Sequence, residues 1–353
     1  MSKVMFNFLV KKKVAEPPID LESILTSNSY LVQQCSLNTE HYVTLFDACF
    51  LPQGLCLYYS LVKNAGDFVL WVLCVDQDCY DLLQRLNLPR LRLLHLDSLE
   101  TPELLAVKAF RSRAEYCWTL TPFAPRFVFE ADKSISRVTY LDADFFFFKS
   151  PGPVFAEFEQ SGKQVLITDH AYAPDSDQSC TSGQYCVQLL VFNRASLISV
   201  CKWWQDQCIN WCKSYAEDGK FGDQKYLESF ESLFPDDVHV LTILDIFLAP
   251  WNASRFPYSR CVAFHFHQLR LTGPATPLKL VSGYYIPKPA LKNIYLPYMK
   301  LLKQLLVFHE LPVPKQSKHQ SLASFIFRTT LAFVSGNGSP GMYRRYISRL
   351  DPW

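Results

Sequence analysis

A strong excess of charge of either sign is absent from this 353-residue sequence. Lysine plus arginine number 35 and aspartate plus glutamate number 33, which gives a formal net charge of +2. Nucleic-acid-binding proteins normally present a strongly basic surface, so this balance argues against nucleic acid as a partner. Hydrophobic residues make up 49% of the chain and charged residues only 19%. A sizeable core can therefore be buried, and wholesale disorder is excluded.

Long apolar runs and two common catalytic loops are also missing. No run reaches the ~18–20 uncharged apolar residues that a membrane-spanning helix needs. The apolar stretch 4–10 precedes Lys11, Lys12 and Lys13, which reverses the order of a secretory signal. Neither a Gly-x4-Gly-Lys-Ser/Thr phosphate loop nor a Gly-x-Ser-x-Gly nucleophile elbow occurs. We therefore expect a cytoplasmic protein that uses neither P-loop nor serine-hydrolase chemistry.

The twelve cysteines lack the spacing of a metal-binding set. They are scattered through apolar stretches such as 73–75, and the pair Cys208 and Cys212 has no second close pair. Buried free thiols in a reducing compartment explain this pattern better than disulfides.

Short apolar runs alternate with helical patterns along the first two thirds of the chain. The apolar runs predict strands at 42–46, 68–75, 91–96, 137–141, 164–168 and 187–192. Helical patterns predict helices at 55–62, 80–86 and 102–116. The unbroken run 68–75 is typical of a parallel strand buried on both faces. This alternation predicts an α/β fold with a mainly parallel sheet flanked by helices.

Ligands of such sheets bind beyond the carboxyl ends of the strands. Polar residues that directly follow the apolar runs are therefore candidates for a site. They are Asp47, Asp76, Asp97, Asp142, Asp144, Asp169, His170 and Asn193.

The chain changes character at both ends. Residues 1–35 predict an irregular lead-in, 36–272 the α/β domain, and 273–353 a mostly helical extension with a helix at 298–306. The last 54 residues carry eight Lys or Arg against Glu310 and Asp351, a local net charge of +6. Together with the apolar segment 325–334, this basic tail is compatible with peripheral contact with the inner face of an anionic membrane. A solvated C-terminal helix pair explains the same pattern, and we favour it.

The sharpest local motif is Asp142-Ala-Asp144, which follows the strand 137–141 and precedes four phenylalanines. Two carboxylates two residues apart can reach one hard cation where the chain bends. Such pairs typically bind Mg²⁺ or Mn²⁺ and leave open positions for phosphate oxygens. Aspartate is also common at strand ends because it bonds to the local backbone, so the pair alone is a weak signal.

Two other segments carry candidate site residues. His265 and His267, at positions i and i+2 of a strand, would face the same side, so both could approach one metal. Without the aspartates, a half-buried pair of histidines is the simpler interpretation. Asp223 follows a glycine-punctuated loop and would open a helix, where N-capping alone explains it. Capping does not explain Gln224.

In this order, the segments 140–144, 222–227 and 265–269 resemble those of nucleotide-sugar glycosyltransferases of the GT-A fold. The resemblance is to bacterial cell-surface-polysaccharide enzymes related to glycosyltransferase family 8, and it covers roughly residues 40–300. It implies a GT-A-like catalytic domain over 36–272. It also implies metal-dependent transfer of a sugar from a nucleotide diphosphate, with UDP favoured, to a glycan or lipid-linked acceptor with retention of configuration.

The resemblance further implies roles for individual residues. Asp142, Asp144 and His265 would hold Mn²⁺ or Mg²⁺. Asp223 and Gln224 would line the donor sugar and the reaction centre. The remaining donor-binding positions would be Asp47 near the base, Arg113 facing the phosphates, and Cys186, Gln188 and Gln268 around the sugar diphosphate.

Three of these positions depart from the family pattern. The family carries Asn-x-Gly where this chain has Cys186 and Gln188, and a glycine where it has Gln268. The departures suit an alternative, a catalytically weakened transferase that binds a glycan or a partner. Another alternative is a metal-dependent phosphodiesterase or nucleotidyltransferase that uses the same carboxylates. Because Asp142, Asp144 and the segment 222–224 are intact, we favour an active transferase.

Overall fold

The computed structural model describes residues 39–272, 279–281, 284, 286–311 and 347–348. The predicted lead-in 1–35 and the apolar tail segment 325–334 lie outside the described residues.

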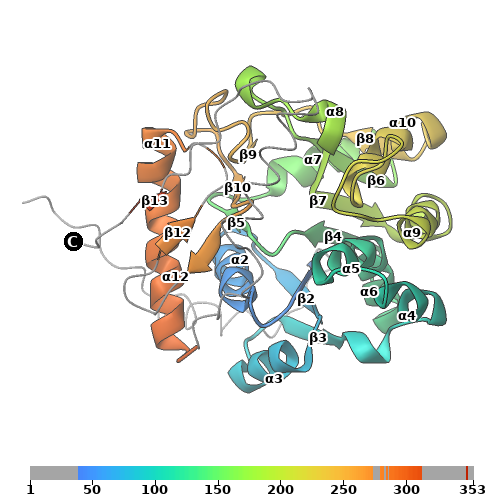
Figure 1. Cartoon of the computed structure of the whole chain (residues 1–353), viewed down its shortest axis with the longest axis horizontal. Helices are drawn as coiled ribbons and strands as arrows, with labels where there is room; N and C mark the ends of the chain where they lie inside the picture. Colours follow the sequence, from blue (N-terminus) through green and yellow to red (C-terminus); the bar gives the residue numbers. More distant parts are fainter. Residues whose placement is uncertain (1–38, 273–278, 282–283, 285, 312–346, 349–353) are drawn as a thin grey trace, which may run out of the picture.

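A seven-stranded sheet forms the centre of the molecule, with strand order β3-β2-β1-β4-β7-β6-β8 (Figure 1). The pairs along β3-β2-β1-β4 are parallel, as is the pair β6 and β8. Only β7 runs antiparallel to its two neighbours. The α/β class with a mainly parallel sheet is therefore confirmed. The strands are β1 (Glu40–Phe46), β2 (Phe68–Cys74), β3 (Leu91–His95), β4 (Arg137–Leu141), β6 (Val165–Asp169), β7 (Tyr185–Asn193) and β8 (Val238–Val240).

Helices cover both faces of this sheet. Successive side chains of a strand point to opposite faces, and here they belong to two different hydrophobic clusters, one on each face. In β1, Tyr42 and Phe46 belong to one cluster and Val43 and Leu45 to the other. The first cluster includes side chains of α2 (Leu51–Asn64), α3 (Gln77–Leu86) and α7 (Gly152–Ser161). The second includes those of α4 (Pro102–Lys108), α5 (Arg113–Leu120), α6 (Ala124–Ala131) and α9 (Val200–Asn210). Shorter turns complete this part: η1 (Leu96–Ser98), η2 (Thr121–Phe123), η3 (Pro174–Ser176), α8 (Ser179–Ser182), η4 (Arg194–Ile198), η5 (Gln224–Ser229) and α10 (Phe230–Leu233).

Two small sheets accompany the central one. The first has the order β5-β10-β9 and is built from β5 (Phe145–Phe147), β9 (Phe247–Leu248) and β10 (Ala263–His265). The second has the order β11-β12-β13 and is built from β11 (Arg270–Thr272), β12 (Lys279–Val281) and β13 (Ile347–Ser348).

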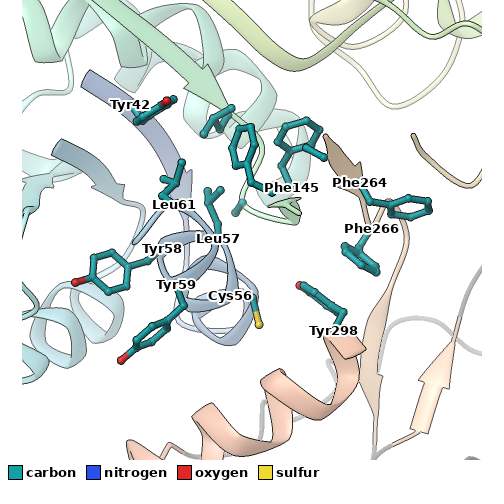
Figure 2. Close-up of a cluster of buried hydrophobic side chains, with 14 of the residues drawn as sticks. Tyr42, Cys56, Leu57, Tyr58, Tyr59, Leu61, Phe145, Phe264, Phe266 and Tyr298 are labelled. Carbon is teal, nitrogen blue, oxygen red and sulfur yellow. The ribbon is translucent and has the colours of Figure 1, made fainter. Parts of the chain in front are cut away.

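Besides β12 and β13, the described part of the C-terminal extension forms helices that pack on the domain. They are α11 (Lys288–Ala290), the π-helical turn η6 (Leu291–Tyr295) and α12 (Leu296–Phe308). Helix α12 contacts α2, and the ring of Tyr298 stacks on Phe266 with centroids 3.7 Å apart (Figure 2). The helix predicted at 298–306 is confirmed. No helix in the described ranges is long and apolar enough to cross a membrane.

The single helix predicted over 102–116 is wrong. Helix α4 ends at Lys108, and α5 begins at Arg113 after a break. Ser112 accounts for the new start, because its side chain accepts from the backbone N–H of Glu115 while the Glu115 carboxylate accepts from the N–H of Ser112 at 2.8 Å. This reciprocal capping box makes 112 a helix start inside an otherwise helical pattern.

The position predicted for Asn193 is also wrong. Asn193 pairs with Arg137, the first residue of β4, so it lies at the edge opposite the carboxyl end of β4. The amino end of β7 lies at the carboxyl edge instead, where Leu189 pairs with Leu141. The antiparallel direction of β7 therefore brings its first residues, not its last, to the predicted site.

Candidate active site

Asp142, Asp144 and His265 converge at the carboxyl edge of the sheet. One potential ligand atom from each of the three lies within 4.8 Å of the others. Nε2 of His265 is 3.1 Å from Oδ1 of Asp144 and 3.5 Å from Oδ2 of Asp142. His267, whose ring centroid is 5.4 Å from that of His265, is not a member of this group.

Strand pairing determines this convergence. The two aspartates occupy the turn between β4 and β5, where the N–H of Phe145 donates to the carbonyl of Asp142. Strand β5 then pairs antiparallel with β10, so that Phe145 is opposite His265. The N–H of Phe266 also donates to the carbonyl of Asp144 at 2.9 Å. A segment far along the chain is thereby held beside the aspartate pair.

Aromatic side chains next to the three residues anchor them in the core. Phe145 follows Asp144, and Phe264 and Phe266 flank His265; all three are fully buried. Figure 2 shows them in one cluster with Tyr298 of α12. The three candidate metal ligands thus lie on backbone that the core fixes.

The electrostatics of the cluster suit a bound cation. Burial raises the pKa of Asp142, an effect that the charge of His265 opposes and that of Asp144 reinforces. Burial alone would lower the pKa of His265, but the carboxylates of Asp144 and Asp142 outweigh it and raise the pKa well above its ordinary value. The imidazolium therefore balances the paired carboxylates, and a divalent cation can take over that balance.

The donor set also fits a divalent metal. Two carboxylate oxygens and one imidazole nitrogen suit Mn²⁺, or Mg²⁺ with less affinity for the imidazole. The Asp142 side chain keeps 28% of its surface exposed, whereas those of Asp144 and His265 keep 11% and 5%. Further ligands can therefore approach from the Asp142 side.

Asp223 lies in the same region and is not a helix cap. Its side chain is buried and makes no capping hydrogen bond to η5, so the capping interpretation is wrong. Burial raises the pKa of Asp223 to about 7; Thr121 opposes this shift, and the negative charge of Asp142 adds to it. The Asp223 backbone is held by the Trp204 indole, which donates to its carbonyl at 2.9 Å.

Gln224 follows directly and is oriented by α8. Its Nε2 donates to the carbonyl of Ser182 at 2.7 Å. The next residue, Lys225, donates to the carbonyl of Ser179 at 2.9 Å. The start of η5 is thus fixed against the segment that precedes β7.

Arg113 joins the carboxyl ends of β1 and β2. Its Nε donates to Oδ2 of Asp47 at 2.6 Å, and its guanidinium also contacts Asp76. Asp76 additionally caps α3 through the N–H of Cys79 and accepts from the N–H of Ala48. In this structure Arg113 therefore binds the two strand-end carboxylates, while its side chain keeps 54% of its surface exposed.

Cys186 and Gln188 lie in an irregular part of β7. Between the pairs Leu166–Val191 and Thr168–Cys186, β7 has more residues than β6, so it bulges. The Thr168 hydroxyl bonds across this bulge to the carbonyl of Cys186 at 3.2 Å, and the N–H of Asp142 donates to the carbonyl of Gln188. Bulges of this kind re-aim side chains and are common beside active sites.

Both bulge side chains are buried. Burial would raise the pKa of the Cys186 thiol, but the imidazoles of His170 and His265 lower it to about 7. Oε1 of Gln188 has no hydrogen-bond partner in the described part of the chain. A buried amide oxygen of this kind normally finds a donor, and a ligand hydroxyl can supply one.

Gln268 is exposed and adopts a left-handed backbone with φ of +57°. This conformation favours glycine, the residue that the family resemblance implies at this position. Gln268 therefore adopts the backbone that a glycine would adopt here, with backbone strain that a glycine would not have.

Sequence reasoning missed two residues that contact the site. Tyr140 donates its hydroxyl to Oδ1 of Asp142 at 3.1 Å. Positions two apart in extended chain share a face, so the 140–142 spacing contained this signal. The Thr121 hydroxyl donates to the carbonyl of Cys117 at 3.4 Å and lowers the pKa of both Tyr140 and Asp223. No local pattern marks Thr121.

At the level of sequence, this chain is similar to bacterial proteins. No protein-family model matches it. The Bacillus subtilis (strain 168) protein YfnF, itself uncharacterized, is 31% identical over 228 residues, which are 63% of this chain and 75% of YfnF. The uncharacterized protein YfnD of the same strain is 28% identical over 284 residues, 76% of this chain and 90% of YfnD. The chain therefore belongs to the family that includes YfnF.

Solved structures with a similar fold include three transferases. Mouse xyloside xylosyltransferase 1 is 16% identical with a TM-score of 0.43, covering 65% of this chain and 98% of that one. The galactosyltransferase LgtC is 12% identical with a TM-score of 0.47, covering 75% and 95%. The glycosyltransferase GlyE of Streptococcus pneumoniae TIGR4, in its apo form, is 14% identical with a TM-score of 0.47, covering 80% and 66%. All three TM-scores are below 0.5, so we derive the function from this chain's own residues.

Proposed function

We propose that this protein is a metal-dependent glycosyltransferase that moves a sugar from a nucleotide-diphosphate donor to a glycan or lipid-linked acceptor. The observation that carries the proposal is the meeting of Asp142, Asp144 and His265 at the carboxyl edge of the sheet. The buried carboxyl of Asp223 interacts electrostatically with Asp142 in the same region.

The metal site addresses the main difficulty of sugar transfer, the negative charge that develops on the leaving diphosphate. A divalent ion held by Asp142, Asp144 and His265 supplies Lewis-acid stabilisation of that charge. The partly exposed Asp142 is the side from which the diphosphate oxygens approach. Of the two predicted ions, the imidazole ligand favours Mn²⁺ over Mg²⁺.

Asp223 and Gln224 are proposed to hold the donor sugar. Because its pKa is about 7, Asp223 can hold a proton or release it near neutral pH. It can thus donate a hydrogen bond to a sugar oxygen or accept one from a sugar hydroxyl. Gln224 would lie beside the reacting carbon, with its orientation set by the bond to Ser182.

The finer assignments rest on the family resemblance. They are UDP as the nucleotide, retention of configuration, and a role in cell-surface polysaccharide synthesis. Asp47 and Arg113 would contact the base and phosphates, which requires the Arg113 pairs with Asp47 and Asp76 to rearrange or to bind the donor as a unit. Cys186, Gln188 and Gln268 would face the sugar diphosphate.

Cytoplasmic location and peripheral membrane contact by the basic tail are further proposals. Flotation of the full chain with anionic vesicles at low and high salt tests the membrane contact.

Thermal unfolding with UDP, GDP, CDP and ADP, each with and without Mn²⁺, tests the donor class. A ligand at ~100 times its Kd adds about 2.7 kcal/mol of stability. We expect a Tm increase of several degrees with one nucleotide, dependent on Mn²⁺. If no nucleotide shifts the Tm, the transferase proposal fails and the binding-protein alternative takes its place.

Two further measurements separate the alternatives. Incubation with nucleotide sugars should release nucleoside diphosphate; release of nucleoside monophosphate would identify a phosphodiesterase or nucleotidyltransferase instead. The combined changes Cys186→Asn, Gln188→Gly and Gln268→Gly should leave activity unchanged or lower it if the native site is competent. A large gain would show that the native site is weakened.

A further inference from the structure

Tyr140 bonds to one specific oxygen of the metal-site aspartate. Its hydroxyl donates to Oδ1 of Asp142 at 3.1 Å, whereas Oδ2 of the same carboxylate is the oxygen 3.5 Å from Nε2 of His265. The two oxygens of Asp142 therefore have different partners. Oδ1 is hydrogen-bonded to the buried Tyr140, and Oδ2 faces His265 of the proposed metal site.

The Tyr140 ring cannot easily reorient. It lies at the end of β4, is 3% exposed and packs within the second hydrophobic cluster. A buried hydroxyl normally needs a hydrogen-bond partner, and Asp142 provides it. A tyrosine phenol carries its proton at neutral pH and is therefore a hydrogen-bond donor to this carboxylate.

Thr121 is a neighbour of both Tyr140 and Asp223. This buried residue begins η2; its hydroxyl donates to the carbonyl of Cys117 at 3.4 Å and lowers the pKa of Tyr140 and of Asp223. Thr121, Tyr140 and Asp223 come from three separate segments, which only the folded chain brings together.

We propose that Tyr140 is a positioning residue of the metal site: its bond to Oδ1 holds the Asp142 carboxylate so that Oδ2 is presented to the cation beside Asp144 and His265. The role rests on the proposed metal-dependent function. A carboxylate held in this orientation loses less rotational freedom when it binds an ion. Residues that orient metal ligands in this way typically contribute about 10- to 100-fold to metal affinity.

The chain offers a matched control for the loss of a tyrosine hydroxyl. Tyr42 lies on the adjacent strand β1, opposite Thr139, and is fully buried. Its hydroxyl has no hydrogen-bond partner in the described part of the chain. Tyr42→Phe and Tyr140→Phe therefore remove equally buried hydroxyls, of which only one bonds to a metal-site residue.

The experiment measures Mn²⁺ binding to the full chain without nucleotide, by calorimetry and by the electron paramagnetic resonance signal of unbound Mn²⁺. Tyr140→Phe should raise the Kd for Mn²⁺ by about 10- to 100-fold, and Tyr42→Phe should bind like wild type. The Tm in EDTA, measured on the same samples, shows whether each variant is folded.

Thr121→Val provides a second variant in case Tyr140→Phe does not fold. It should raise the Kd for Mn²⁺ by a smaller factor than Tyr140→Phe does. Thr139→Val should leave the Kd unchanged, because the buried Thr139 hydroxyl has no hydrogen-bond partner among the described residues. Wild-type affinity in folded Tyr140→Phe, or an equal loss in Tyr42→Phe, overturns the positioning role while the proposed function stands. If Tyr140→Phe does not fold, wild-type affinity in Thr121→Val overturns the role. Absence of Mn²⁺ binding by the wild type overturns both.

Discussion

Nε2 of His265 lies 3.1 Å from Oδ1 of Asp144, where β10 pairs with β5. The two residues come from distant parts of the chain, and their side chains keep only 5% and 11% of their surface exposed. A buried imidazole placed against two carboxylates is an arrangement that a proton or a divalent cation must neutralise. This relationship underlies the first prediction.

Asp144→Asn should abolish Mn²⁺ binding and sugar transfer while the chain remains folded. Asp144 is buried against His265, so the isosteric amide is a safer change than alanine. Asn keeps the shape and an oxygen acceptor while it removes one of two like charges. Mn²⁺ calorimetry and nucleoside-diphosphate release check the effect. Asp206→Asn, an exposed residue of α9, is the control, and transfer by Asp144→Asn would exclude the metal assignment.

Asp223→Asn should stabilise the metal-free protein at alkaline pH and not at pH 4. Burial raises the Asp223 pKa from 3.8 to about 7, so wild-type stability falls as pH rises between these values and levels off above pH 7. The sign follows because the folded state binds the proton more tightly than the unfolded state there. At about 1.4 kcal/mol per pKa unit, the gain at pH 8 can approach 4 kcal/mol.

Urea unfolding in EDTA across pH 4–8 measures this difference. Asp206→Asn, with an exposed carboxylate, should show no such trend. A wild-type minus Asp223→Asn difference that stays constant with pH would mean that Asp223 is ionised in the fold throughout this range.

Gln268→Gly should stabilise the protein by about 0.5–1 kcal/mol. The left-handed φ of +57° costs a residue with a Cβ about 1–2 kcal/mol, which glycine avoids at some cost in chain entropy. A Tm increase of about 1 °C is expected for a chain of this length. Gln268→Ala keeps the strain and should give no increase; equal stability of the glycine and alanine variants would rule out backbone strain as the cause.

Ser112→Ala should destabilise the protein by about 1 kcal/mol, the usual value of an N-cap. The change removes the bond to the N–H of Glu115 and leaves the break between α4 and α5 without its cap. Ser232→Ala, on an exposed turn of α10, should change the Tm much less. Equal losses in the two variants would show that the capping box does not set the start of α5.

Much of the sheet follows from local sequence because buried parallel strands are continuous apolar runs. The run 68–75 became β2 for this reason, and the aspartates that end the runs mark the carboxyl edge. The pair Asp142 and Asp144 could be predicted as metal ligands because its spacing and its position at a strand end both indicate a metal site. His265 was assigned by resemblance, and its distance to Asp144 could not be predicted from the local pattern.

Other features had no local signal. The apolar run that became β7 has the same composition whether it lies parallel or antiparallel, so Asn193 was expected at the wrong edge. The pattern 102–116 contains no proline or glycine break after its first residue, and Ser112 interrupts it through a hydrogen bond instead. Asp223 fits a helix cap by sequence, yet the fold buries it beside Thr121.

The sequence by itself determined six of the seven strands of the central sheet, that the sheet is mainly parallel, and which carboxylates stand at its binding edge, because apolar periodicity and strand-end residues are local properties. The tertiary structure alone decided the direction of β7, the register that brings His265 to Asp144, and the burial of Asp223. These depend on pairing and packing between segments far apart in the chain, where burial sets both the geometry and the pKa of each group.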